Sequence, residues 1–182
     1  YVTLYAATET EAALTSGKVK VKQETKYPFE GNIALTIDPA KDGQRFALRL
    51  RIPTWARGKR FLPGKLYSFK EAPPPWSLQV NGKVVTPRME KGFAVLDRTW
   101  KAGDKVQLDL PMPVQFSTAF NRVVAYNGRV AVTRGPLVFC AEEIDNGMQI
   151  QRLAAPQLPK PDQVKVTSIK EGLLKGMLLI SF

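Results

Sequence analysis

The sequence contains no histidine and a single cysteine, Cys140, among its 182 residues. Histidine is the commonest general base and the commonest metal ligand in proteins, and a disulfide within one chain needs two cysteines. The apolar runs are also short: stretches such as 130–132 and 177–180 fall far below the roughly 20 residues that span a bilayer. We therefore expect no internal disulfide, no histidine-based catalysis and no membrane partner.

Positive charge is in excess, with 27 lysines and arginines against 16 aspartates and glutamates, a formal net charge of +11. Such a balance favours an anionic partner. The basic residues are nevertheless scattered along the chain, and the densest group, Arg57, Lys59 and Arg60, is short. The sequence also lacks the recognised nucleic-acid-binding motifs. We expect a solvated basic surface and no nucleic-acid partner, while a polyanionic sugar fits the same charge.

Alternation of apolar and polar residues with a period of two dominates the sequence and predicts half-buried strands. It is clearest in 45–52, where the apolar residues Phe46, Leu48, Leu50 and Ile52 share one face. The other face carries Arg45, Ala47, Arg49 and Arg51. The alternation recurs in 32–37 and 105–110. Segment 9–14 is short for a helix and precedes Ser16-Gly17, so we predict that it forms a hairpin with 18–23. Further strands are predicted at 1–6, 77–80, 92–97, 129–133 and 137–140. Asn81-Gly82 predicts a tight hairpin turn, since both residues tolerate positive φ. This pattern predicts an all-β fold, an antiparallel, jelly-roll-like β-sandwich.

The organisation changes along the chain at two places. Residues 57–75 carry glycines and prolines without alternation and are predicted to be an insertion in a sandwich that spans residues 1–143. The insertion holds several apolar side chains, which predict packing against the sandwich flank or another domain: Phe61, Leu62, Leu66, Tyr67 and Phe69. Residues 144–182 form a proline-rich linker with strands at 164–169 and 177–182. Two strands cannot bury a core, so this tail packs on the first domain or begins a second one.

The chain begins with Tyr1 and shows no signal peptide, so we expect a piece of a longer protein, and no compartment is indicated. Residues that could carry glycosidase chemistry are scarce. Glu142 and Glu143 are neighbours on a strand and leave opposite faces, while Glu24 and Glu30 meet only if the turn between them folds back. Cys140 is predicted to be a small core hydrophobe, because no histidine activates it. We therefore predict no catalytic, cofactor-binding or metal-binding residue.

The tryptophans are the remaining candidates for binding, since exposed aromatic rings can stack on sugars. Trp100 precedes the turn 101–104 and is predicted to cap the core, and Trp55 closes a predicted strand. Trp76 follows the proline run 73–75 and is the best candidate for an exposed platform. Tyr27 and Phe29 are weaker candidates for the same role.

Five segments, in order along the chain, carry a family resemblance. They are QETKYPFEG at 23–31, LRLRIPTWA at 48–56, VNG at 80–82, RTWKAGD at 98–104 and NGRVAVTRGPLV at 127–138. Together they resemble the region that follows the catalytic barrel in glycoside hydrolase family 127, the β-L-arabinofuranosidase-like enzymes. The match covers residues 1–145.

The resemblance implies an (α/α)6 barrel elsewhere, in which a zinc-bound cysteine is the nucleophile and a glutamate the acid/base. This sequence has no counterpart of that barrel, and Cys140 lies in the sandwich motif instead of the family's cysteine cluster. The resemblance therefore implies a non-catalytic sandwich that supports the catalytic barrel of the same parent chain, with zinc only in the barrel. The alternative is an independent carbohydrate-binding module that contacts plant-type glycans.

Overall fold

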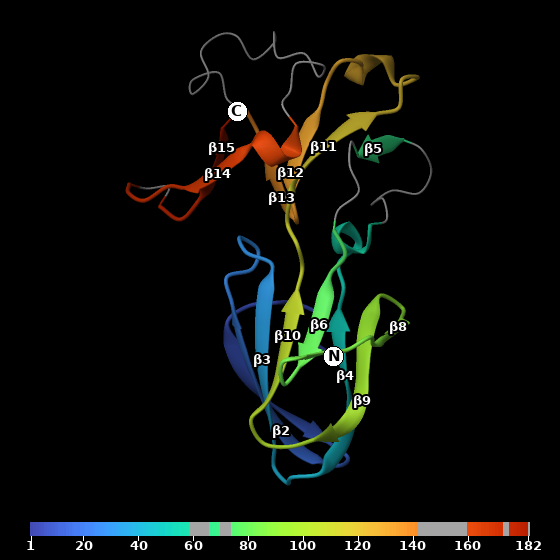
Figure 1. The fold of residues 1–182 in the computed structure, drawn as a ribbon, viewed down its shortest axis with the longest axis vertical. Helices are drawn as coiled ribbons and strands as arrows, with labels where there is room; N and C mark the ends of the chain where they lie inside the picture. Colours follow the sequence, from blue (N-terminus) through green and yellow to red (C-terminus); the bar gives the residue numbers. More distant parts are fainter. Residues whose placement is uncertain (59–65, 70–73, 142–159, 173–174, 182) are drawn as a thin grey trace. The chain divides into compact units, whose positions relative to one another are not determined.

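The computed structural model describes residues 1–58, 66–69, 74–141, 160–172 and 175–181, and these form a β protein (Figure 1). The chain divides into two compact units. The first unit comprises 1–59 and 74–111, and the second comprises 60–73 and 112–182. The strands after residue 112 pair with one another and with part of the insertion, so they group apart from most of the strands before them. The predicted domain limits, 1–143 and 144–182, stay a prediction.

The first unit contains two antiparallel sheets. The larger sheet has the strand order β1-β2-β3-β10-β6-β7. Its strands are β1 (Thr8–Leu14), β2 (Gly17–Thr25), β3 (Asn32–Pro39), β10 (Asp104–Asp109), β6 (Ser77–Val80) and β7 (Lys83–Val84). The smaller sheet has the order β4-β9-β8, formed by β4 (Gln44–Arg51), β9 (Phe93–Trp100) and β8 (Arg88–Glu90). All neighbouring strands in both sheets are antiparallel.

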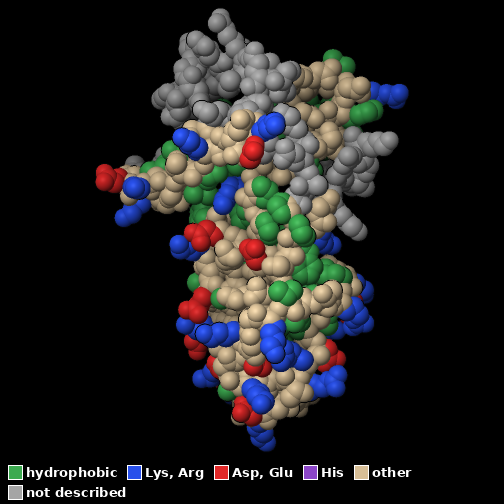
Figure 2. Space-filling view, viewed as in Figure 1, with side chains coloured by type: hydrophobic (Ala, Val, Ile, Leu, Met, Phe, Trp, Pro, Cys, Tyr) green, Lys and Arg blue, Asp and Glu red, His purple; other side chains and the backbone are tan. Residues whose placement is uncertain are grey.

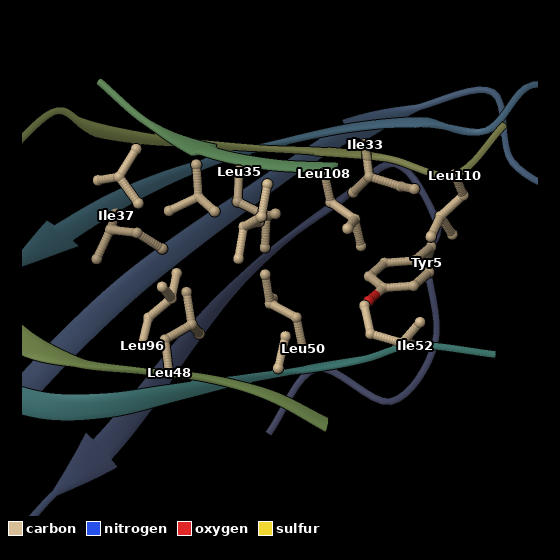
Figure 3. Close-up of a cluster of buried hydrophobic side chains, with 14 of the residues drawn as sticks. Tyr5, Ile33, Leu35, Ile37, Leu48, Leu50, Ile52, Leu96, Leu108 and Leu110 are labelled. Atoms are coloured by element: carbon tan, nitrogen blue, oxygen red, sulfur yellow. The ribbon is translucent and has the colours of Figure 1, made fainter. Parts of the chain in front are cut away.

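The core lies between these two sheets, which confirms the predicted sandwich (Figure 3). Alternating side chains of β3 and β10 point at alternating side chains of β4 and β9, the arrangement that period-two patterning produces. The fully buried members include Ile33, Ile37, Leu50, Val106 and Leu108, each at most 1% exposed. Leu110, one residue beyond β10, and Ile52, one beyond β4, extend the core at one end.

The hairpin turn at Asn81-Gly82 is also confirmed. Asn81 has φ 50° and Gly82 has φ 74°, the positive values that a tight turn between β6 and β7 requires. The predicted hairpin of 9–14 with 18–23 is present as β1 and β2, paired from Thr8↔Gln23 to Leu14↔Gly17. The strand predicted at 1–6 is wrong, because only Val2 pairs, in a parallel bridge to Leu50.

The second unit contains a four-stranded sheet of order β13-β12-β11-β5 and a two-stranded sheet. The first is formed by β13 (Leu137–Phe139), β12 (Ala131–Arg134), β11 (Val114–Ala119) and β5 (Tyr67–Phe69). The second is formed by β14 (Lys165–Ser168) and β15 (Leu178–Ser181). The described chain also has three 3-10 turns, η1 (Thr54–Arg57), η2 (Val124–Tyr126) and η5 (Pro161–Gln163).

The insertion 57–75 was predicted from its lack of alternation, and a short strand within it, β5, pairs antiparallel with β11. The neighbouring backbone is continuous with this pairing, since the Phe120 amide donates to the Leu66 carbonyl at 2.7 Å. Residues 67–69 of the insertion thus form an edge strand of the second unit. Lys59, Arg60, Phe61 and Leu62 lie outside the described residues. Across the described chain, no helix is long and apolar enough to cross a membrane.

Candidate functional site

The acidic residues considered for glycosidase chemistry do not form a facing pair in the described chain. Lys22 Nζ lies 3.0 Å from Glu24 Oε1, and Lys26 Nζ lies 3.1 Å from Glu30 Oε1. Both carboxylates are exposed and each is neutralised by its own lysine. The glutamates at 142 and 143 lie outside the described residues. Glu24 and Glu30 therefore behave as surface ion pairs, which are worth little energetically.

Cys140 is exposed and free, so its predicted place in the core is wrong. It follows β13, whose exposures alternate: Val138 is 70% exposed, and Cys140 falls on the same outward face. The alternation was read correctly, but the wrong face was assigned to the core. Among the described residues, no group of three histidine, cysteine or carboxylate side chains comes together to hold a metal ion. The residues present do not fit a zinc site.

The three tryptophans do not form an exposed sugar platform. Trp100 is 0% exposed, as predicted, and its Nε1 donates a 3.0 Å hydrogen bond to the Phe46 carbonyl. The rings of Trp100 and Phe46 stack with centroids 5.5 Å apart. Trp76, the predicted platform, is partly buried and packs against the core, as does Trp55. The reason is that Trp76 directly precedes β6, a strand of the larger sheet of the sandwich.

A surface rich in arginine lies on the outer side of the smaller sheet, and we call it the arginine face. Alternation and strand register place ten side chains there, on β4, β8 and β9. They are Arg45, Ala47, Arg49, Arg51, Arg88, Glu90, Phe93, Val95, Asp97 and Thr99. The face thus carries four arginines and two carboxylates.

Ion pairs and an aromatic pair order one part of the arginine face. Glu90 Oε2 lies 3.5 Å from Arg49 and 3.2 Å from Arg88, each through Nη2. The Tyr1 ring meets Phe93 edge to face with centroids 5.3 Å apart, and the Arg49 guanidinium lies 5.2 Å from the Tyr1 centroid. Arg49 therefore joins a carboxylate and an aromatic ring, two contacts that suit a planar guanidinium.

The first residues of the chain are attached to the free edge of β4. The Val2 amide donates to the Arg49 carbonyl at 2.8 Å, and the Arg51 amide donates to the Val2 carbonyl at 3.0 Å. Tyr5 is buried, and its hydroxyl donates a 2.6 Å hydrogen bond to the Arg51 carbonyl. Burial raises the pKa of the Tyr5 phenol, with a smaller contribution from Tyr27 in the same direction. The hydroxyl therefore stays protonated and remains a donor.

Sequence reasoning found the arginines of β4 but not the cluster they form. The alternation in 45–52 places the arginines on one face, yet nothing in the pattern pairs Tyr1 with Phe93. On the visible surface of the first unit, basic and acidic side chains are interspersed (Figure 2). This mixture of charges reflects the scatter of basic residues along the sequence.

Comparison with known proteins gives a consistent result. Residues 1–112 match the family model described as "Beta-L-arabinofuranosidase, GH127 middle domain", and residues 114–170 match "Glycoside hydrolase family 127 C-terminal domain". The junction between the two matches agrees with the division of the structure into units. A curated relative from Bifidobacterium longum subsp. longum, a non-reducing end β-L-arabinofuranosidase, is 36% identical over 139 residues.

Solved structures of similar proteins also align with almost the whole chain. A structure described as a GH127 β-arabinofuranosidase is 35% identical, with a TM-score of 0.77 over 99% of this chain. A GH127 β-L-arabinofuranosidase from Geobacillus stearothermophilus T6 is 33% identical, with a TM-score of 0.77 over 97% of this chain. The chain spans 18% of the curated relative and 27% and 25% of these two structures.

Proposed function

Because the chain belongs to glycoside hydrolase family 127, we propose that it is a non-catalytic β region of a longer β-L-arabinofuranosidase-type hydrolase. In this proposal it supports the catalytic barrel of the same parent chain. The observation that carries the proposal is the pair of matches to a middle and a C-terminal domain, in a chain about a quarter or less the length of its relatives. A middle domain implies a further domain before it.

The side chains of the described residues support a role without chemistry. Glu24 and Glu30, two of the candidates for catalysis, are in exposed ion pairs, and Cys140 is an exposed thiol that belongs to no group of three metal-ligating side chains in the described part of the chain. Zinc and the nucleophilic cysteine are expected in the barrel, from the family resemblance. We assign no zinc-dependent step to this chain.

The test compares the full-length parent protein with residues 1–182 on an aryl β-L-arabinofuranoside, with and without added zinc. We expect hydrolysis by the parent and none by residues 1–182 under either condition. The Cys140→Ala variant of residues 1–182 serves as the control. Turnover by residues 1–182 that this substitution removes would contradict the assignment of chemistry to another domain. A parent that does not cleave β-L-arabinofuranosides would contradict the enzyme class.

A further inference from the structure

The two outer faces of the sandwich carry different basic residues. On β4 the outward positions 45, 49 and 51 are all arginine, and on β2 the outward positions 18, 20 and 22 are all lysine. We call the outer side of the larger sheet, with these lysines and Lys105 of β10, the lysine face. Arginine is enriched in the cores of protein interfaces, whereas lysine is depleted there and is typical of solvated surface.

Aromatic side chains follow the same division. Tyr1 and Phe93 form an edge-to-face pair on the arginine face, and Tyr1 is 78% exposed. By contrast, no aromatic side chain faces outward from the described strands β2, β3, β6 and β10 of the larger sheet. Exposed aromatic rings beside arginines are the composition of interface hot spots. Leu4, 74% exposed in the segment attached to β4, adds apolar surface at the same edge.

One arginine of this face, Arg51, makes no ion pair within the described chain, although its charge acts on the neutral Tyr5 phenol. Arg51 is exposed at the end of β4, opposite Phe93, and its guanidinium has no ion pair or hydrogen bond within the described chain. Its neighbours on the face are paired: Arg45 with Asp97 at 3.2 Å, and Arg49 with Glu90. Arg51 is therefore free to meet a carboxylate on another domain, and it stands directly across the strand pair from the Tyr1–Phe93 cluster.

We propose that the arginine face is the surface on which the catalytic barrel of the parent chain docks. This proposal rests on the proposed function. The chain enters the first unit at this face, because Val2 is hydrogen-bonded along the free edge of β4. Polypeptide that precedes Tyr1 in the parent therefore starts beside the arginine face, and the relatives are about four times the length of this chain. The barrel surface that meets Arg51 carries a carboxylate.

A photo-crosslinking experiment tests the docking directly. A benzophenone amino acid is placed at Arg51 in the full-length parent, and in a matched protein at Lys105, an exposed position on the lysine face. After irradiation, the crosslinked peptides are identified by mass spectrometry. We expect position 51 to crosslink within the same molecule to residues upstream of Tyr1, and position 105 to give at least about tenfold less of that product, since interface labelling depends on direct contact.

Charge reversal provides the second measurement. We expect Arg51→Glu in the full-length parent to increase proteolytic cleavage just before Tyr1 by about tenfold. The carboxylate introduced at position 51 repels the carboxylate of the barrel, and this repulsion weakens docking. Lys105→Glu makes the same change in charge on the other face and should alter cleavage by less than about twofold. We also expect the effect of Arg51→Glu on cleavage to decrease as the salt concentration rises, because salt screens the interaction between the charges.

Other outcomes overturn the docking proposal. Crosslinks from position 51 to residues 112–182 or to a second molecule would show that another occupant covers the arginine face. The absence of any crosslink would show that nothing docks there. Loss of accessibility at Tyr1 on adding arabinan oligosaccharides, without crosslinks to upstream residues, would identify the face as a glycan-binding surface. Crosslinking does not depend on activity, so a parent that lacks β-L-arabinofuranosidase activity but crosslinks as expected would remove the proposed enzyme class and leave the interface standing.

Discussion

The side chains of Asn81 and Asp104 are joined by a 2.8 Å hydrogen bond from Asn81 Nδ2 to Asp104 Oδ1. Asn81 Oδ1 accepts from the Lys105 amide at 2.8 Å, and Asp104 Oδ2 accepts from the Lys101 amide at 3.0 Å. The hairpin turn after β6 and the turn before β10 are thus fastened together by two side chains. Burial acts to raise the pKa of Asp104, but the hydrogen bonds from Asn81 and Lys101, with the charges of Arg98 and Lys101, outweigh it and hold the pKa below its usual value.

The lowered pKa of Asp104 predicts an acid-dependent loss of stability. The folded state binds this proton more weakly than the unfolded state does, so the contribution is complete above the unfolded pKa, about 3.9. It is lost as the pH falls through the lower folded pKa. We expect Asp104→Asn to lower the free energy of unfolding at pH 7. The difference in free energy between this variant and the original chain should disappear as the pH falls from about 5 to about 2. Urea unfolding at each pH measures it, with Asp109→Asn, an exposed carboxylate on the same strand, as the control. A difference that does not change with pH would contradict the prediction.

Trp100 predicts the largest loss of stability from a single truncation. The indole is 0% exposed, stacks on Phe46 and satisfies the Phe46 carbonyl through Nε1. We expect Trp100→Ala to lower the free energy of unfolding by about 3–5 kcal/mol, because a large cavity opens in the core. Trp100→Phe leaves the Phe46 carbonyl without its donor but keeps a ring in the core. It should therefore lower the free energy of unfolding by less than Trp100→Ala does. Denaturant titration measures both, and a loss below about 1 kcal/mol for Trp100→Ala would show that the core tolerates the cavity.

Strands with one buried and one solvated face were predictable from the sequence, because their alternation reports that environment. β4 is the clearest case, with Leu48 and Leu50 buried and Arg45 and Arg51 exposed. β11 was missed because Val114, Gln115 and Phe116 are all buried, so no alternation marks it. β5 was missed because it is only three residues long and lies in a segment rich in proline and glycine.

The arginine face could be predicted only in part. Alternation placed Arg45, Arg49 and Arg51 together, since neighbours two apart on a strand share a face. The contact of Tyr1 with Phe93 depends on the cross-strand register and on where the first residues cross the edge of β4, and neither leaves a local pattern. Cys140 shows the same limit of sequence patterns. Alternation separates the residues of a strand into two faces, but it does not tell which face packs against the core.

The exposure of Cys140 predicts that its thiol is reactive in the folded protein. It is the only cysteine of the sequence, and it is free and exposed. We expect a thiol reagent such as dithionitrobenzoate to modify one equivalent without denaturant, and Cys140→Ser to change stability by less than about 0.5 kcal/mol, as for other exposed substitutions. Labelling that requires denaturant would show that the thiol is covered in solution.

Gly135 predicts a steric effect that can be separated from backbone strain. It lies between β12 and β13 with φ 58°, and a Cβ added there would come within 2.5 Å of Met112 Cε. Gly128 also has a positive φ, 75°, but a Cβ added there would meet nothing within 4 Å. Substitution of either glycine by alanine should lower the free energy of unfolding by about 1–2 kcal/mol, because a left-handed backbone conformation disfavours a side chain.

The comparison of the two alanine variants isolates the contact with Met112. We expect Gly135→Ala to cost about 1–3 kcal/mol more than Gly128→Ala, because Met112 is buried and overpacking displaces it. Met112→Leu removes the terminal methyl, the atom that a Cβ would approach most closely, so it should reduce the extra cost of Gly135→Ala in the double variant. Denaturant titration of the single and double variants gives this coupling energy. Equal losses for the two glycine variants would mean that the Met112 side chain moves aside freely, and that only the backbone conformation requires glycine at position 135.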